Sequence, residues 1–258
     1  GLMIHGGGEM RLRAGVQYVV YNLAGSCLFL AALGTIYAVT GTLNMADLAV
    51  RVAQLPPQDT ALLRTGAVLL MLVFAVKAAL VPLHFWLPAT YANAPGPVAA
   101  LFSIMTKVGL YGIVRFYTLV FPPGGGAGTL VADLLLPAAA ATLVLGQAGV
   151  MGSRDLGRMA SWAALASVGT LTLAVARFTP QGISAGLFYL IHSTLATAAL
   201  FLVADLIARR RGSLRLVPGP SIPQGGLIAV FLMAAAVAIA GLPPLSGFLG
   251  KIAVLKAS

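Results

Sequence analysis

The sequence predicts an all-α fold, a polytopic bundle of transmembrane helices. Of the 258 residues, 59% are hydrophobic and 9% are charged, and the mean hydropathy is +0.97. Ordinary soluble domains carry roughly 25% charged residues. The apolar stretches follow one another with short polar connections, so we expect residues 1–258 to form a single transmembrane domain in a lipid bilayer.

Helices are the expected spanning elements, because backbone polar groups must be satisfied internally in hydrocarbon and about 17 to 25 residues cross roughly 30 Å. Complete spans are expected at Gln17–Val39, Ala61–Val81, Pro97–Phe121, Leu130–Met151, Met159–Ala176, Ile183–Ala208 and Gly225–Ala240. The connections Gln54–Asp59, Pro122–Gly128 and Arg209–Gln224 are polar or rich in Gly and Pro. A last apolar run from Phe248 is too short to finish a crossing, and Gly1 is not an initiator, so we expect the chain to be part of a longer polypeptide.

Two apolar segments contain prolines that argue against a continuous helix. The first is Val81-Pro-Leu-His-Phe-Trp-Leu-Pro88, and the second is Gly241-Leu-Pro-Pro-Leu-Ser-Gly247. Interrupted helices at corresponding places of two halves indicate an ion or substrate path in transporters with repeated architecture.

The basic residues predict the orientation of the spans. Eight fall on the side that holds the amino terminus, namely Arg11, Arg13, Arg154, Arg158, Arg209, Arg210, Arg211 and Arg215. Four fall on the other side, namely Arg51, Arg64, Arg115 and Arg177. Cytoplasmic loops carry the excess of Lys and Arg, so the amino terminus is expected in the cytoplasm. These arginines flank apolar spans and do not form a basic face interleaved with aromatics, which argues against nucleic-acid binding.

Four lysines lie in or next to the apolar spans, and the depth of one of them, Lys256, is undefined because it lies near the end of the sequence. Lys107 is about ten residues into its span, roughly 15 Å from the nearer end, which is too deep for its side chain to reach water. A charge at that depth costs a few kcal/mol and normally faces the bundle interior or a hydrated cavity, so we assign Lys107 to an ion path. Lys77 and Lys251 adjoin the two breaks, and each either joins this path or extends to the membrane interface.

His192 lies inside the span Ile183–Ala208, and its imidazole titrates near neutral pH unless it is desolvated. It is interpreted either as a proton relay or as a core histidine bonded to a backbone carbonyl. His84 is expected beside Trp86 at the membrane interface, with a functional role as the alternative. Hydroxyls near His192 suggest a hydrated polar track, whose second tier would comprise Ser193, Thr194, Thr197 and His84.

All six acidic residues lie in loops or within about a turn of a span end. The deep lysines therefore either lose their protons, because desolvation disfavours the charged form, or pair with a carboxylate outside this sequence. Asp205 is expected to pair with Arg209 four residues on.

Soluble-enzyme chemistry finds no support. Gly6-Gly-Gly8 and Gly124-Gly-Gly126 lack the strand and helix context of a phosphate loop. The single Cys27 excludes an internal disulfide and a cysteine metal site. We expect no cofactor, no bound metal and no catalytic site in this chain.

Two segments resemble the proton-translocating antiporter-like family, namely Ala75–Val98 and the motif Ser103-Ile-Met-Thr-Lys-Val-Gly-Leu-Tyr111. That family includes the large membrane-arm subunits of respiratory complex I, their counterparts in membrane-bound hydrogenases, and the multisubunit Na+/H+ antiporters. The resemblance continues through Asp155-Leu-Gly-Arg-Met159, where Gly157 replaces the family's usual lysine, and through Gly241–Lys251. Within the family, the segments Tyr37–Met45 and Leu242–Lys251 are most similar to the D subunits of the multisubunit Na+/H+ antiporters.

The resemblance implies two inverted five-helix repeats, each with one broken helix, the second starting near residue 130. Lys77, Lys107, His192 and Lys251 match the family's relay residues, and the family's partner for Lys77 is a glutamate on a helix that would end just before Gly1. We therefore expect an inner-membrane subunit of a multisubunit antiporter that exchanges H+ for a monovalent cation such as Na+, together with other membrane subunits. The alternative is a proton-pumping subunit of complex I or a hydrogenase.

Two rival interpretations are a small-molecule permease and a passive helical scaffold. A permease needs a substrate-sized polar pocket, whereas these groups form a string of isolated titratable sites. A scaffold needs no central lysine.

Overall fold

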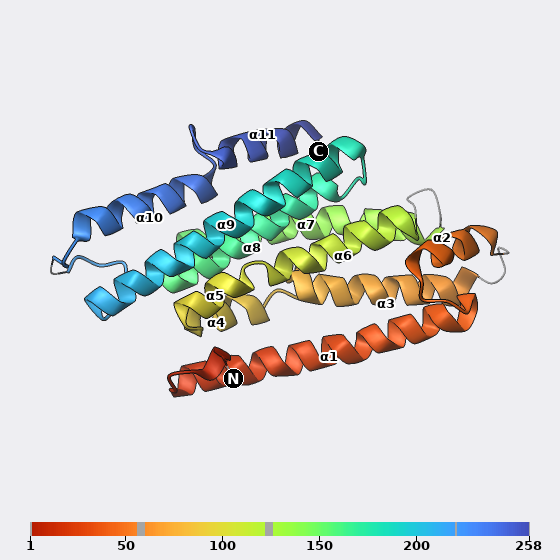
Figure 1. Cartoon of the computed structure of the whole chain (residues 1–258), viewed down its shortest axis with the longest axis horizontal. Helices are drawn as coiled ribbons and strands as arrows, with labels where there is room; N and C mark the ends of the chain where they lie inside the picture. Colours follow the sequence, from red (N-terminus) through yellow and green to blue (C-terminus); the bar gives the residue numbers. More distant parts are fainter. Residues whose placement is uncertain (1, 56–59, 122–125, 220, 258) are drawn as a thin grey trace.

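The computed structural model describes residues 2–55, 60–121, 126–219 and 221–257, and the regular elements within them are helices (Figure 1). In chain order they are η1 (Leu2–Ile4), α1 (Glu9–Thr40), α2 (Met45–Gln54), α3 (Thr60–Ala78), α4 (Trp86–Asn93), α5 (Gly96–Phe102), α6 (Met105–Leu119), α7 (Gly126–Gly152), α8 (Leu156–Val175), α9 (Pro180–Arg211), α10 (Gly225–Ala240) and α11 (Ser246–Ala257). In this part of the chain six segments are long and apolar enough to cross a membrane, with α10 as a shorter apolar helix. The predicted all-α transmembrane fold is confirmed.

The first span is longer than expected and is followed by a helix that the sequence did not reveal. α1 contains 32 residues and ends at Thr40, and the capping residue Gly41 adopts the left-handed conformation that favours glycine. The short α2 begins at Met45 and is capped by Asn44, whose side chain accepts a hydrogen bond from the Ala46 N–H. Arg51 fixes α2 to the end of α1, because it bonds both the Thr40 carbonyl at 2.9 Å and the Asp47 carboxylate at 3.0 Å. The Arg51 hydrogen bond also holds the pKa of Asp47 below its ordinary value.

The first predicted break splits one crossing into two half-helices. α3 ends at Ala78, α4 begins at Trp86, and both pack along α1 (Figure 1). That His84 and Trp86 lie at the membrane interface stays a prediction. Trp86 is only 4% exposed, and its indole N–H donates to the Val76 carbonyl at 3.0 Å.

A further interruption divides the expected span Pro97–Phe121. α5 ends at Phe102 and α6 begins at Met105, so Ser103 and Ile104 form a turn just before Lys107. Neither residue is a proline or a glycine, and the interruption was not predicted.

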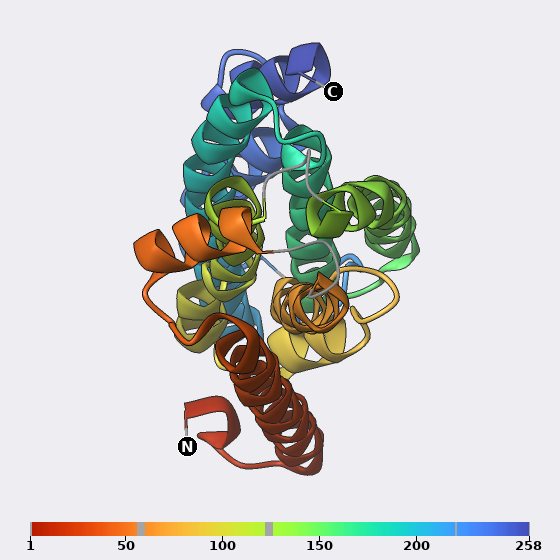
Figure 2. The same ribbon diagram turned by 90° about the vertical axis from the view of Figure 1, so that its right-hand side faces the viewer.

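α8 is the central helix of the bundle. Most of its residues are buried, and it contacts α7 on one side and α9 on the other (Figure 2). The backbones of α7 and α8 approach closely, since a Cβ on Gly169 would lie 2.5 Å from the Leu143 nitrogen. The second predicted break then separates α10 from α11, and both of these helices pack along α9.

The connections divide between the two ends of the bundle as the span order predicts. The Leu156 N–H donates to the Leu214 carbonyl at 2.9 Å, and the Leu216 N–H donates to the Arg154 carbonyl at 3.0 Å. The α7–α8 turn therefore lies beside the α9–α10 loop.

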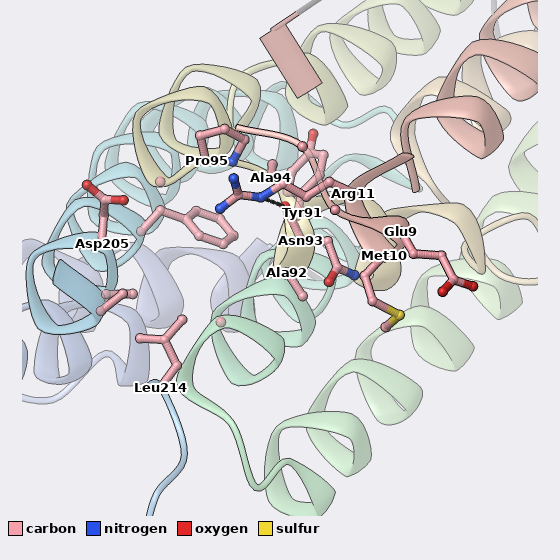
Figure 3. A pocket seen from close by; sticks show the side chains of 17 residues that line it. Glu9, Met10, Arg11, Tyr91, Ala92, Asn93, Ala94, Pro95, Asp205 and Leu214 are labelled. Carbon is pink, nitrogen blue, oxygen red and sulfur yellow. Dashed lines mark hydrogen bonds between the residues drawn. The ribbon is translucent and has the colours of Figure 1, made fainter. Parts of the chain in front are cut away.

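A second contact at the same end of the bundle involves α1. Arg11 donates to the Asn93 carbonyl at 3.2 Å, beside a hollow of about 410 Å³ that Asp205 also lines (Figure 3). We call this end the amino-terminal face. That it is cytoplasmic stays a prediction, and part of the opposite connection, residues 56–59, lies outside the described residues.

Candidate functional site

Lys77 lies in the last turn of α3, directly before the first break. Its ammonium group donates to the Asn22 side-chain oxygen at 2.5 Å. Asn22 is roughly 20 Å along α1 from Glu9 at 1.5 Å per residue, so this pair sits near the middle of the bundle. A hollow of about 300 Å³ adjoins both side chains and is also lined by Tyr18 and Ser26.

Lys107 is completely buried and lies in the first turn of α6, after the unexpected interruption. Its ammonium group donates to the Ser167 hydroxyl at 3.1 Å, and that hydroxyl donates in turn to the Ala164 carbonyl at 2.6 Å. Gly109 allows α6 to approach the end of α3, because a Cβ there would lie 3.0 Å from the Lys77 Cβ. The helices that carry the first two lysines are therefore in direct contact.

Hydroxyl groups occupy the contact between α5, α6 and α9. Ser103 donates to the Thr194 carbonyl at 3.2 Å, which ties the α5–α6 interruption to α9. Thr106 and Thr197 are buried, and in the described part of the chain their hydroxyls have no hydrogen-bond partner. Buried polar groups of this kind are normally bonded to protein or to ordered water, so these two are suitable sites for water between Lys107 and α9.

His192 bridges the two halves of the second broken helix. One ring nitrogen, Nε2, lies 3.0 Å from the Ala238 carbonyl on α10, and the other, Nδ1, lies 2.9 Å from the Ser246 hydroxyl on α11. A carbonyl only accepts, so in the neutral ring Nε2 carries the proton and Nδ1 accepts from Ser246. A Cβ on Gly247 would lie 2.7 Å from Nε2, which makes glycine a requirement of this arrangement.

Lys251 binds the same helix end as His192. Its ammonium group donates to the Ala240 carbonyl at 2.8 Å. The last carbonyls of a helix lack intrahelical partners and carry the negative end of the helix dipole. The carboxyl end of α10 is thus an acceptor site for two groups that can carry positive charge.

Carboxylates do not take part in this arrangement within the described residues. The three ion pairs found there each join an arginine to an acid four residues earlier, including the expected Asp205–Arg209 pair at 2.7 Å. Lys77, Lys107 and Lys251 instead contact an amide, a hydroxyl and a carbonyl oxygen.

The expected second tier is only partly connected to these groups. Ser193 and Thr194 both donate to the Leu190 carbonyl of their own helix, which is a common alternative to interhelical bonding. His84 lies in the first break with its buried Nδ1 unbonded among the described residues, and its ring centre is 6.1 Å from that of Trp162.

Sequence reasoning missed three partners, Asn22, Ser167 and Ser246. Each is a polar residue within or beside an apolar helix, and that signal marks Asn22 most clearly, since its amide lies well inside the long apolar α1.

The chain is similar to known membrane proteins over nearly all of its length. A family model described as NADH:quinone oxidoreductase/Mrp antiporter, TM, matches residues 2–258. A Rhizobium meliloti protein, named as the probable D subunit of a K(+)/H(+) antiporter, is 40% identical over 279 residues, and the Na(+)/H(+) antiporter D subunit of Bacillus subtilis is 36% identical over 257. Each alignment covers 99% of this chain and 51% of the relative, so the chain spans about half the length of these curated relatives.

The fold is shared by solved structures of large membrane complexes. A chain of the Mrp complex from Dietzia sp. DQ12-45-1b superposes with a TM-score of 0.88 at 32% identity, covering 100% of this chain and 48% of that one. A chain of respiratory complex I from Thermus thermophilus superposes with a TM-score of 0.84 at 31% identity, covering 100% and 55%. The protein is a multi-pass membrane protein of the plasma membrane, and it belongs to the family of NADH:quinone oxidoreductase and Mrp antiporter transmembrane subunits.

Proposed function

We propose that this chain forms part of the ion-translocating D subunit of a multisubunit monovalent cation/H+ antiporter, working with other membrane subunits. Protons would pass by way of Lys77, Lys107, His192 and Lys251, with water between them. The observation that carries the proposal is the position of these groups, within the bundle and beside helix interruptions, where each contacts neutral oxygens. The names of the relatives supply the antiporter context.

Lys77 would act as the switch of the relay. A lysine beside a carboxylate holds its proton, and removal of the carboxylate leaves desolvation to favour release. The hollow beside Lys77 and Asn22 has room for such a partner from outside residues 1–258. When the carboxylate leaves, the neutral Asn22 oxygen stabilises the ammonium less than an ion pair does, and the proton moves on.

Lys107 and His192 would carry the proton across the centre. A proton released by Lys107 would pass to water near the Thr106 and Thr197 hydroxyls and then reach Nδ1 of the imidazole. When Nδ1 accepts this proton, the Ser246 hydroxyl must turn, because it can no longer donate to that nitrogen.

Lys251 would be the exit residue of the second half. The carbonyl end of α10 would stabilise one positive charge at a time on His192 and Lys251, since two cations at one helix end repel each other. We also propose that the breaks before Trp86 and before Ser246 belong to two inverted repeats, the second starting near residue 130.

The second candidate function is proton pumping in a complex I-like respiratory enzyme. The specific observation that favours it is the likeness to a chain of respiratory complex I, with a TM-score of 0.84. Under that alternative protons move in response to a redox reaction in other subunits, and no monovalent cation is exchanged.

The test is transport by the full antiporter complex, purified and reconstituted in vesicles with an imposed pH gradient. We expect added Na+ or K+ to dissipate the gradient in the native complex and not in the Lys107→Ala complex. A gradient that is unaffected by either cation in the native complex would favour the respiratory alternative. Equal dissipation by the native and Lys107→Ala complexes would overturn the relay.

A further inference from the structure

The amino-terminal face contains a basic hollow that the ion path does not use. It has a volume of about 920 Å³ and lies where the α7–α8 turn meets the α9–α10 loop. Its lining includes the guanidinium-bearing residues Arg154, Arg158 and Arg215, together with Trp162 and Val217.

The backbone that carries these arginines is fixed. Residues 154–156 pair with residues 214–216 through two backbone hydrogen bonds of 2.9 and 3.0 Å. Arg211 supports the second segment, since its guanidinium donates to the carbonyls of Arg215 and Val217. Two segments about sixty residues apart in sequence thus hold their arginines at one place.

The charges in the hollow are not neutralised by the described residues. No carboxylate there lies within 4.0 Å of the guanidinium groups of Arg154, Arg158 or Arg215, and all three residues are exposed. Asp155 also lines the hollow, but one of its carboxylate oxygens accepts from the Arg158 backbone N–H as the cap of α8. The hollow therefore carries three positive charges against one negative.

The surroundings are amphipathic. Trp162 packs directly on Gly149, where an added Cβ would overlap its ring, so an indole and a bare backbone form one wall. Leu145 and Leu134 lie on the same side of α7 as Gly149, and their side chains are 40% and 50% exposed. An aromatic ring between a charged rim and an apolar helix face is typical of the membrane–water interface.

We propose that this hollow binds the phosphate of an anionic phospholipid headgroup, with an acyl chain lying against α7. Arginine suits phosphate because its planar guanidinium donates two parallel hydrogen bonds. A lipid fits better than a soluble phosphate, because the exposed Leu145 and Leu134, on the side of α7 that carries Gly149, would contact an acyl chain. This site is independent of the proposed transport path and would anchor the amino-terminal face to the bilayer surface.

The experiment measures lipid retention by the full complex. The native complex and the double variant Arg158→Gln/Arg215→Gln are purified in detergent, and the phospholipids they retain are counted by native mass spectrometry. The control is Arg13→Gln/Arg210→Gln, which removes the same charge from the same face outside the hollow. The complexes are also placed in discs of phosphatidylcholine alone, with added inorganic phosphate, or with phosphatidylglycerol, and their thermal unfolding is followed.

We expect the native and control complexes to retain an anionic phospholipid and the Arg158→Gln/Arg215→Gln complex to bind it about 30-fold more weakly. Phosphatidylglycerol should stabilise the first two and not the third. Equal retention by all three complexes would overturn the proposal. Equal stabilisation by inorganic phosphate would overturn the lipid assignment. A Val217→Cys variant tests whether another subunit covers the hollow, and crosslinking of this cysteine to another subunit would also overturn the assignment.

Discussion

The Ser246 hydroxyl is the side-chain partner of His192, so a single substitution can remove it and test the proposed relay. Ser246→Ala deletes a hydrogen bond of 2.9 Å to Nδ1 and leaves the bond from Nε2 to the Ala238 carbonyl in place. Because this hydrogen bond lies at an exposed position, the free energy of unfolding should fall by about 1 kcal/mol or less. Transport should fall far more, by about 10-fold or greater, since a positioned proton donor and acceptor contributes about 100-fold in comparable steps.

The assay compares three variants of the full complex in vesicles, at matched assembly levels. Ser246→Thr retains a hydroxyl at the same position and should restore most of the transport. Thr65→Ala is the matched control, because it removes an exposed helical hydroxyl that donates at 3.1 Å to the Ala61 carbonyl of its own helix. It should transport like the native complex.

A structural role for Ser246 would give a different pattern. If Ser246→Ala lowered the assembly level and the transport in proportion, the hydroxyl would only support the fold. If Ser246→Ala transported normally, proton transfer at Nδ1 of His192 would not involve this residue, and the order of steps proposed for the second half would be wrong.

Three further predictions concern the centre, the second break and the orientation. Lys107→Ala should assemble normally, because it removes a buried charge, but it should lose transport. Lys107→Arg should not restore transport, because a guanidinium does not release its proton. Measuring the ion flux through matched amounts of each complex tests both expectations. Gly247→Ala should lower stability by about 1–3 kcal/mol, because its Cβ would overlap the Ala238 carbonyl oxygen, and an unchanged thermal midpoint would contradict this contact. A cysteine at Ser213 should react with an impermeant reagent only from the cytoplasm and one at Gln54 only from outside, and the reverse labelling would mean that the orientation is inverted.

The spans could be predicted well from sequence because length and hydropathy are sufficient evidence for a helix in a bilayer. Proline was a less reliable guide to interruptions. Pro137 lies inside the unbroken α7, whereas the turn at Ser103 contains neither proline nor glycine. Membrane helices tolerate proline where neighbouring groups satisfy the freed carbonyl, and the tertiary bond from Ser103 to the Thr194 carbonyl stabilises a turn that no local signal marks. The amphipathic α2 was missed because it is too short and too polar to resemble a span.

The burial of Lys107 could be predicted from sequence, whereas the partners of the titratable groups could not. Lys77 and Asn22 are 55 positions apart, Lys107 and Ser167 are 60 apart, and His192 and Ser246 are 54 apart. Contacts of that range depend on how the helices pack, and hydropathy carries no information about packing.

The neutral character of those partners has a mechanistic consequence. A carboxylate fixed beside each lysine would hold every proton in place, because an ion pair in a medium of low dielectric strongly favours the charged form. An amide, hydroxyl or carbonyl oxygen stabilises the ammonium form less, so a small change in the surroundings is enough for the lysine to release its proton. A relay of this kind therefore needs one partner that carries a full negative charge and can move, and the hollow beside Lys77 is where the chain has room to receive it.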